Sequence, residues 1–384
     1  MTGLLALGFF RGAQAAPTTA AGPGIRASSA ALISAGGQRI LWEKDGRRRR
    51  APASTTKIMT ALVVLKRARL DETVNVSARA AATPGSRIWL SAGETISVGD
   101  LLYGLLLTSG NDAAVALAEH VAGSVEGFAR LMNAEAAAIG ATETHFRNPH
   151  GLDETGHYTT ARDLALIASR ALQDPILARI VATKRAVIAW PGHGVDRALR
   201  NRNRLLWEYE GADGVKTGFT AEAGKCLVAS ATRNRLHLVA VIMDSPDIWA
   251  DGAALLDYGF SRFTPEVVIS RGEVARTCRV AGGDLERASL VARDDLVVPV
   301  SSGEAGRVQV RLEGDEVLRA PIQAGTEYGR LVAIVDGEDL ASVPLVAVQN
   351  VRAQTTFRSF WGKLVELFRA VLRAIAGRAI GRTP

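Results

Sequence analysis

Apolar residues recur at helical spacing in several stretches of the first half of the chain. The most apolar of them, residues 56–66, predicts a helix that is buried on nearly all sides. Further helices are predicted over residues 100–107, 112–121, 125–139 and 161–172. The last two are amphipathic, so each is expected to turn one face toward a core.

Short apolar runs predict strands on either side of this helical region. The runs 31–34 and 39–42, with two glycines between them, predict a hairpin. Runs over 227–231 and 236–243 are typical of the central strands of a sheet. This mixture of helix and strand signals predicts an α+β domain over residues 25–260.

From about residue 261 the pattern changes to short strands with frequent turns. Apolar and polar residues alternate over 307–312 and 331–335, and Gly-containing pairs mark the turns between such runs. Helical spacing is nearly absent there. The pattern predicts a small all-β domain over residues 261–351.

The last stretch, residues 352–384, predicts an amphipathic helix with a basic polar face. Its apolar stripe consists of Phe357, Phe360, Trp361, Leu364, Phe368, Val371, Leu372 and Ile375. Basic residues cover the opposite side, and Glu366 is the one acidic residue of the stretch. Large aromatic residues opposite basic ones are typical of a helix that lies in a bilayer interface, so this segment is a predicted membrane anchor. The alternative is an ordinary helix that packs on the body of the protein.

Residues 1–24 predict a signal peptide followed by a linker. A short apolar run leads to Ala13-Gln-Ala, which has the form of a secretory cleavage site. No Lys or Arg precedes the apolar run, which suggests a start inside a longer signal peptide. The alternative is an N-terminus without regular structure. Residues 18–24 form a linker of small residues in either case.

The positive charge of the chain is concentrated in its tail. The formal net charge is +7, with 46 Lys and Arg against 39 Asp and Glu. Residues 349–384 hold seven basic residues and one acidic residue, or +6, so the first 348 residues together carry about +1 (7 − 6). A body this close to neutral argues against a nucleic-acid partner, which would require a basic face. The charge of the tail suits anionic lipid head groups instead.

The two cysteines, Cys226 and Cys278, are too few for a disulfide framework. Cys226 lies in an apolar, strand-like run, which favours a buried free thiol, and a disulfide between the two is the alternative in an exported chain.

His150 and His157 flank a Gly-containing loop, but no carboxylate–histidine signature accompanies them. No metal or other cofactor is therefore expected.

Three short motifs that could carry chemistry occur in order: Ser54-Thr-Thr-Lys57, Ser109-Gly-Asn111 and Lys216-Thr-Gly218. Each is weak alone. The chain has only seven lysines and hence 39 arginines (46 − 7), yet two of the motifs contain Lys. An Arg could not act as a base at residue 57, because a guanidinium stays protonated. Because the chain otherwise prefers Arg, the lysines of these two motifs indicate a chemical role and not only a positive charge.

The spacing of the first motif has a physical reason. Ser54 at the start of the buried helix places Lys57 one turn along, where side chains at i and i+3 meet. An amine in an apolar site beside a second cation loses affinity for its proton and can deprotonate a serine hydroxyl. Lys216, on the edge of a strand, is the expected second cation. Thr217 is expected to donate a hydrogen bond, and Gly218 to leave room for substrate backbone.

Ser109 and Asn111, between two helices, are expected to relay a proton and to hold a substrate amide. Taken singly, the motif residues have ordinary explanations: Ser54 as an N-cap, Asn111 as a loop residue and Lys216 as a solvated strand residue. A Ser–His–Asp site is the competing scheme, but the six histidines lack a Gly-x-Ser-x-Gly elbow.

The sequence around the motifs resembles the low-molecular-mass penicillin-binding proteins of the D-alanyl-D-alanine carboxypeptidase family. The resemblance is carried by Arg50-Ala-Pro-Ala-Ser-Thr-Thr-Lys-Ile-Met-Thr, Leu107-Thr-Ser-Gly-Asn-Asp-Ala, Phe146-Arg-Asn-Pro-His-Gly-Leu-Asp and Asp213-Gly-Val-Lys-Thr-Gly-Phe-Thr. It implies a catalytic domain of the β-lactamase and DD-peptidase type, with helices flanking an antiparallel sheet. A small all-β domain and an amphipathic C-terminal helix would follow.

The resemblance also implies a role for each motif residue. Ser54 becomes the acylated nucleophile and Lys57 its general base, while Ser109 and Asn111 line the cleft. The backbone N–H groups of Ser54 and Phe219 form the oxyanion hole.

The substrate's terminal carboxylate has its own set of residues in the family. The matching positions here are Lys216, Thr217, Gly218 and Arg202. A second arginine of the family is expected just after Met243, where this chain has Asp244-Ser-Pro-Asp instead. Arg202 and Lys216 are expected to suffice for the carboxylate.

The activity implied is that of a serine D-Ala-D-Ala carboxypeptidase, which removes the last D-Ala of peptidoglycan stem pentapeptides through an acyl-enzyme. Covalent inhibition by penicillin and attachment to the outer face of the cytoplasmic membrane are implied as well. DD-endopeptidase action on cross-links and a non-catalytic cell-wall-binding protein are the alternatives. β-Lactamase action is disfavoured, since no Glu-x-x-Leu-Asn motif follows Asn111.

Overall fold

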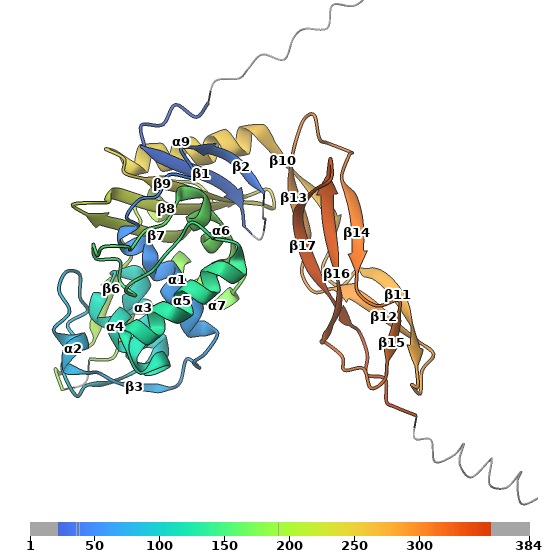
Figure 1. Ribbon diagram of the computed structural model, residues 1–384, viewed down its shortest axis with the longest axis horizontal. Helices are drawn as coiled ribbons and strands as arrows, with labels where there is room; N and C mark the ends of the chain where they lie inside the picture. The colour runs from blue at the N-terminus through green and yellow to red at the C-terminus, as the bar shows by residue number, and fades with distance from the viewer. Residues whose placement is uncertain (1–21, 36, 38, 191, 355–384) are drawn as a thin grey trace, which may run out of the picture.

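The computed structural model describes residues 22–35, 37, 39–190 and 192–354 (Figure 1). Most of the predicted signal peptide and linker, and the predicted helix from Phe357 onward, lie outside the described residues. Within the described part of the chain, no helix is long and apolar enough to cross a bilayer.

The first domain is built on a five-stranded antiparallel sheet with the strand order β2-β1-β9-β8-β7 (Figure 1). The strands are β1 (Ser29–Ser34), β2 (Ile40–Lys44), β7 (Ala212–Thr220), β8 (Gly224–Arg233) and β9 (Leu236–Met243). Because β1 pairs with β9, the beginning and the end of the domain meet inside the sheet. The predicted hairpin and the two predicted central strands are confirmed, and β7 lies at the edge of the sheet.

Helices cover both faces of the sheet. α9 (Ile248–Arg262) packs on one face, and α1 (Lys57–Leu65) and α6 (Ala161–Ala171) lie on the other (Figure 1). The remaining helices are α2 (Ala78–Ala81), α3 (Val98–Leu107), α4 (Asn111–Ala122), α5 (Val125–Ile139), α7 (Pro175–Ala182) and α8 (Leu205–Glu208). Two hairpins complete the domain: β3 (Thr73–Asn75) with β4 (Thr95–Ser97), and β5 (Arg185–Ile188) with β6 (Arg197–Arg200).

The helices predicted from apolar spacing are confirmed, with ends shifted by no more than two residues. Side-chain caps define several of their starts. Ser97, Ser124 and Thr160 each accept a hydrogen bond from the backbone N–H three residues further on. In α1 every residue from Lys57 to Val64 is buried, as expected of a run without a polar face.

Helix α9 was not expected from the pattern, because two glycines weaken its helical signal. The packing of α9 on the sheet explains why both residues are glycine. A Cβ atom on Gly252 would lie 2.9 Å from Leu227 Cδ2, and one on Gly259 would lie 2.6 Å from Leu238 Cδ1. The glycines thus let α9 approach the sheet closely, and this packing outweighs their low helix propensity.

The second domain contains only strands among its described residues, so its predicted all-β character is confirmed. β10 (Phe263–Ile269) pairs with β13 (Leu296–Ser301), and a six-stranded sheet has the order β14-β16-β17-β12-β11-β15. The strands of this sheet are β11 (Val274–Ala281), β12 (Arg287–Ala292), β14 (Gln309–Glu313), β15 (Val317–Arg319), β16 (Glu327–Val335) and β17 (Glu338–Ala347). They enclose a core separate from that of the first domain.

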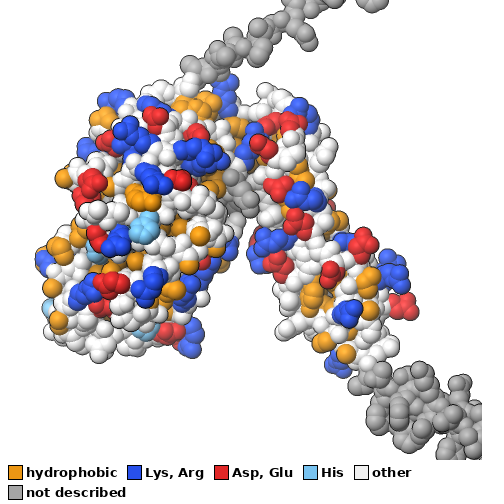
Figure 2. Space-filling model, viewed as in Figure 1, with side chains coloured by type: hydrophobic (Ala, Val, Ile, Leu, Met, Phe, Trp, Pro, Cys, Tyr) orange, Lys and Arg blue, Asp and Glu red, His pale blue; other side chains and the backbone are white. Residues whose placement is uncertain are grey.

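Contacts outside the α9–β10 connection also join the two domains. Arg39 Nη1 lies 2.6 Å from Glu304 Oε1, and Gly37 forms a β-bridge with Ala341. On the face shown in Figure 2, acidic and basic side chains are interspersed over both domains, as expected of a nearly neutral body.

Cys226 and Cys278 are both buried free thiols, so the thiol predicted for Cys226 is confirmed and the alternative disulfide is not formed.

Candidate active site

The first motif lies where the buried helix begins. Ser54 belongs to a single 3₁₀ turn, η1 (Ala53–Thr56), and Lys57 is the first residue of α1. Side chains at i and i+3 are nearly eclipsed in a 3₁₀ turn. Lys57 Nζ accordingly donates a hydrogen bond of 2.9 Å to Ser54 Oγ.

Lys57 is fully buried at the centre of the three motifs. Its Nζ atom also donates to Asn111 Oδ1 at 2.7 Å and to the backbone oxygen of His150 at 2.6 Å. Burial, and then the positive charges of Lys216 and Arg202, hold the pKa of Lys57 well below its ordinary value of 10.5. The lowered pKa makes it easier for Nζ to lose one of the three protons that it donates, and the resulting neutral amine can accept the hydrogen bond of the Ser54 hydroxyl, as a general base must.

Lys216 brings the third motif to the same place from the edge strand β7. Its side chain is 1% exposed, and its Nζ atom donates to the backbone oxygen of Thr217 at 2.9 Å. Burial, assisted by the charge of Arg202, lowers the pKa of Lys216 to about 7. An incoming anion would pair with this lysine and restore its charge.

Ser109 and Asn111 close the site on the side of α3 and α4. Asn111 is the first residue of α4 rather than a loop residue, and its Nδ2 atom donates to the backbone oxygen of Pro84 at 2.7 Å. Ser109 has a left-handed backbone with φ of 69°, a conformation rarely adopted by Ser. Its Oγ atom is buried and has no hydrogen-bond partner among the described residues, so the hydroxyl is available to another group.

Close backbone packing holds the turn that carries Ser54. A Cβ atom on Gly218 would lie 3.0 Å from the backbone nitrogen of Ser54, so β7 passes directly beside this turn. On another side, a Cβ atom on Gly151 would lie 1.8 Å from the backbone oxygen of Ala53. Ala53 has a φ of 47°, and such a strained residue persists only when its surroundings hold it. Phe219 follows Gly218 with a side chain that is 68% exposed.

A buried histidine, not assigned to the site from the sequence, supports the same turn. His157 Nδ1 accepts the backbone N–H of Arg147 at 3.0 Å, so its hydrogen is on Nε2. Nε2 lies 3.0 Å from Thr56 Oγ1, which donates in turn to the backbone oxygen of Ala53. Burial lowers the pKa of His157 to about 4, and the ring stays neutral near pH 7.

His150 contributes to the site through its backbone oxygen. Burial and the nearby Lys57 lower the pKa of its ring to about 3. Its Nδ1 atom accepts the backbone N–H of Leu152 at 3.2 Å, which shapes the loop beside Lys57. Across the described residues, no group of three or more His, Cys, Asp and Glu side chains could hold a metal ion.

Arg202 lies at the mouth of the site and donates from Nη1 to Ser86 Oγ at 2.8 Å. Asp244, at the place where a second family arginine was expected, has a structural role. Its Oδ2 atom accepts hydrogen bonds from Ser28 Oγ at 2.8 Å and from Arg50 Nη1 at 3.1 Å. Arg50 also donates to Ser29 Oγ, and these contacts leave its side chain 17% exposed.

Two sequence models of known families match the chain. The model of the D-alanyl-D-alanine carboxypeptidases matches residues 16–247. The model of the C-terminal domain of penicillin-binding protein 5 matches residues 263–353. The first match contains all three motifs, and the second covers the all-β domain.

Named relatives resemble the chain over most of its length. The D-alanyl-D-alanine carboxypeptidase DacF of Bacillus subtilis is 34% identical over 337 residues, which are 85% of this chain and 86% of the relative. The carboxypeptidase DacA of Escherichia coli K12 is 33% identical over 365 residues, or 90% of this chain and 88% of the relative.

Solved structures show the same likeness in three dimensions. Penicillin-binding protein 5 of Haemophilus influenzae superimposes with a TM-score of 0.64 at 33% identity, covering 86% of this chain and 99% of the other. The D-alanyl-D-alanine carboxypeptidase DacD of Francisella tularensis gives a TM-score of 0.61 at 29% identity, covering 90% of this chain and 99% of the other.

Proposed function

The chain belongs to the D-alanyl-D-alanine carboxypeptidase family, and from this premise we propose that it removes the terminal D-Ala of peptidoglycan stem peptides through an acyl-enzyme on Ser54. One observation carries the assignment of the nucleophile. The fully buried amine of Lys57, with its pKa held well below 10.5, lies 2.9 Å from Ser54 Oγ, within hydrogen-bond distance. This is the arrangement of a nucleophile with its base.

In the acylation step, Lys57 takes the proton of Ser54 Oγ as this oxygen attacks the carbonyl carbon of the penultimate D-Ala. Negative charge then develops on the carbonyl oxygen. The backbone N–H groups of Ser54 and Phe219 are the proposed donors to it. The position of Ser54 at the start of α1 adds the positive end of the helix dipole.

The free carboxylate of the substrate's last residue is held on the β7 side of the site. Lys216 and Arg202 provide positive charge, and Thr217 provides a hydroxyl. Binding of a carboxylate raises the pKa of Lys216 above the value of about 7 that it has in the free protein. A carboxypeptidase needs such a cation, because its substrate ends in a negative charge.

The leaving D-Ala requires a proton on its amine. Ser109 Oγ is the proposed relay between Lys57 and this amine, since it is buried and lacks a partner among the described residues. After D-Ala departs, Lys57 accepts a proton from the water that attacks the ester of Ser54. Lys57 passes this proton to Ser54 Oγ as the ester bond breaks, which restores the serine and releases the shortened peptide.

The direct test measures free D-Ala released from a peptide that ends in D-Ala-D-Ala. The protein should release it, and Ser54→Ala should abolish both this release and covalent labelling by a fluorescent penicillin while the thermal unfolding midpoint is kept. A non-catalytic cell-wall-binding protein would release no D-Ala. A strict DD-endopeptidase would cleave a cross-linked muropeptide dimer and leave the pentapeptide intact.

We also propose that the enzyme acts outside the cytoplasm, attached to the outer face of the cytoplasmic membrane by residues 352–384. The proposal rests on the aromatic and basic pattern of that segment. A chain ending at Gln354 should no longer sediment with phosphatidylglycerol vesicles, whereas the full chain should. Both should release D-Ala at the same rate. Loss of both properties together would mean that the segment is part of the folded body.

A further inference from the structure

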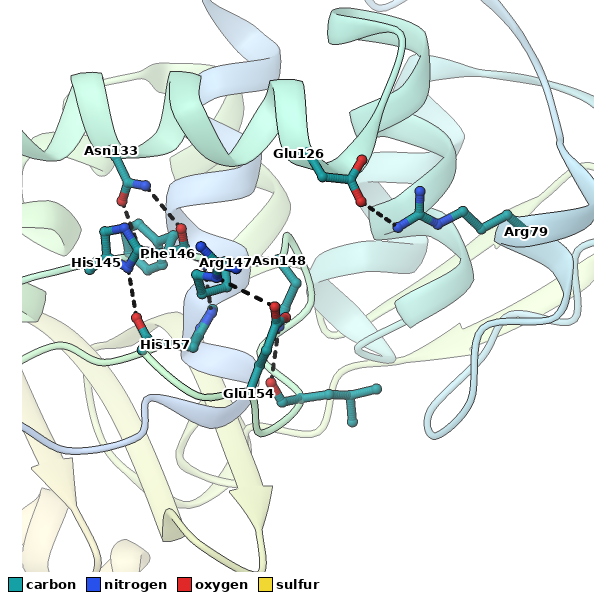
Figure 3. A network of polar contacts seen from close by, with 11 residues as sticks. Arg79, Glu126, Asn133, His145, Phe146, Arg147, Asn148, Glu154 and His157 are labelled. Carbon is teal, nitrogen blue, oxygen red and sulfur yellow. Dashed lines mark hydrogen bonds and ion pairs between the residues drawn. The ribbon is translucent and has the colours of Figure 1, made fainter.

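A cavity of about 630 Å³ opens beside the catalytic cleft, between α2, α5 and the loop of residues 145–154 (Figure 3). Two of its lining residues also contact the motif residues. The backbone oxygen of Pro84 accepts from Asn111 Nδ2 at 2.7 Å, and that of His150 accepts from Lys57 Nζ at 2.6 Å. The cavity is therefore adjacent to the cleft on the Asn111 side.

The lining of the cavity combines an apolar part with charged groups. The apolar part is formed by buried side chains, which are those of Val115, Val125, Ala129 and Phe146. Two ion pairs belong to the charged part, one from Arg79 to Glu126 at 3.0 Å and one from Arg147 to Glu154 at 3.5 Å. Arg130 of α5 is a third arginine in the lining.

Both ion pairs are accessible and can exchange partners. The side chains of Arg79 and Glu126 are 55% and 64% exposed, and those of Arg147 and Glu154 are 52% and 44% exposed. Such pairs contribute little to stability, so opening one to admit a ligand costs little. Figure 3 shows Arg79 and Glu126 on one side of the view, with Arg147, Asn148 and Glu154 in its centre.

The direction of the substrate follows from the proposed function, on which this inference rests. If Lys216 and Arg202 hold the terminal carboxylate, the upstream part of the peptide leaves the cleft past Asn111, toward Pro84 and His150. One residue of extended chain spans about 3.5 Å. A peptide that leaves the cleft on this side would bring the side chain of the residue before D-Ala-D-Ala toward the cavity.

We propose that this cavity binds the side chain of the third stem-peptide residue, and that it favours a side chain ending in both an ammonium and a carboxylate, as in diaminopimelate. The methylenes of such a side chain fit the apolar lining. Its carboxylate pairs with both Arg147 and Arg130, and its ammonium pairs with Glu154. A lysine offers only the ammonium and leaves the arginines without an anion.

The test compares D-Ala release from three acylated peptides X-D-Ala-D-Ala, with X as meso-diaminopimelate, L-Lys or L-2-aminopimelate. The first has both end groups, the second only the ammonium and the third only the carboxylate. We expect kcat/KM for the diaminopimelate peptide to exceed the other two by about tenfold, the size of one good charge-assisted contact.

Two cavity variants test which residues cause the preference for the diaminopimelate peptide. Arg147→Gln and Arg130→Gln should each lower kcat/KM for the diaminopimelate peptide by about five- to tenfold while leaving the lysine peptide unchanged. Arg69→Gln is the matched control, since Arg69 forms an exposed ion pair with Asp71 in the same domain, outside the cavity. Arg69→Gln should leave kcat/KM unchanged for both the diaminopimelate and the lysine peptide. Thermal unfolding midpoints check that each variant is folded.

The outcomes separate this inference from the proposed function. Equal kcat/KM for the three peptides, or equal losses on all three in both cavity variants, would overturn the binding of the third residue and leave the carboxypeptidase assignment in place. If none of the peptides released D-Ala, the carboxypeptidase assignment would fail, and the inference with it.

Discussion

Gly218 of the edge strand and Ser54 of the 3₁₀ turn are in direct backbone contact: a Cβ atom on Gly218 would lie 3.0 Å from the Ser54 nitrogen. Two motifs that are far apart in the chain meet here without an intervening side chain. The contact places the proposed nucleophile next to the strand that carries Lys216.

Gly218→Ala should therefore impair acylation with little effect on folding. The added methyl group pushes the turn and the strand apart by a few tenths of an ångström, and small displacements of reacting groups slow catalysis by up to about 100-fold. The second-order rate of labelling by a fluorescent penicillin measures the effect. Gly303→Ala is the control, because its Cβ would meet no atom within 4 Å. An unchanged labelling rate in Gly218→Ala would contradict the importance of this contact.

Lys57→Arg should abolish D-Ala release while preserving the positive charge. A guanidinium stays protonated at any usable pH and cannot accept the proton of Ser54, and loss of a general base costs about 10²–10⁴-fold in rate. Lys225→Arg provides the control, since Lys225 is exposed and its side chain donates to the backbone oxygen of Pro246. Activity of Lys57→Arg near that of the unmodified protein would exclude Lys57 as the base.

The pH profile of kcat/KM should be bell-shaped. Activity rises as Lys57 loses its proton, because the neutral amine is the base, and this happens well below pH 10.5. Activity falls again as Lys216, whose pKa is about 7, loses the charge that attracts the carboxylate. Lys216→Arg should remove the falling limb, since its guanidinium stays charged. A falling limb that persists in this variant would assign it to another group.

The fold should lose stability in mild acid through His157. Its pKa is about 4 in the folded protein and 6.5 when exposed, so the unfolded chain binds more protons between these pH values. Stability therefore falls as the pH drops from 6.5 toward 4, by about 3 kcal/mol for this one group. Urea unfolding of the protein and of His157→Gln across this range measures the difference. Equal slopes against pH would show that His157 is not held neutral.

Local pattern was enough to predict the five most periodic helices and the meeting of Ser54 with Lys57. A run without a polar face predicts the buried helix α1, and Ser and Lys three residues apart meet within one turn whatever surrounds them. Both features lie within a few consecutive residues. Arg50 and Asp244, in contrast, are distant in sequence and form a partly buried ion pair that no local pattern links.

Two glycines also show that local sequence does not predict which segments pack together. Gly252 and Gly259 weaken the helical pattern of α9, and only the sheet beneath them shows that they allow close packing. Similarly, Arg197 and Glu94 form an ion pair with side chains only 3% and 4% exposed, and no local pattern links these two residues. Such pairings depend on which elements become neighbours.

The sequence by itself determined the three motifs, the helices with clear apolar spacing and the concentration of positive charge beyond residue 348. It did so because helix spacing, strand alternation and motif chemistry are properties of short stretches of chain. The tertiary structure alone decided that the Lys57 amine is buried beside two other cations, that His157 supports the Ser54 turn, and that a charged cavity adjoins the cleft. Burial and long-range contact arise only when distant segments pack together, and those are the factors that shift a pKa or shape a binding site.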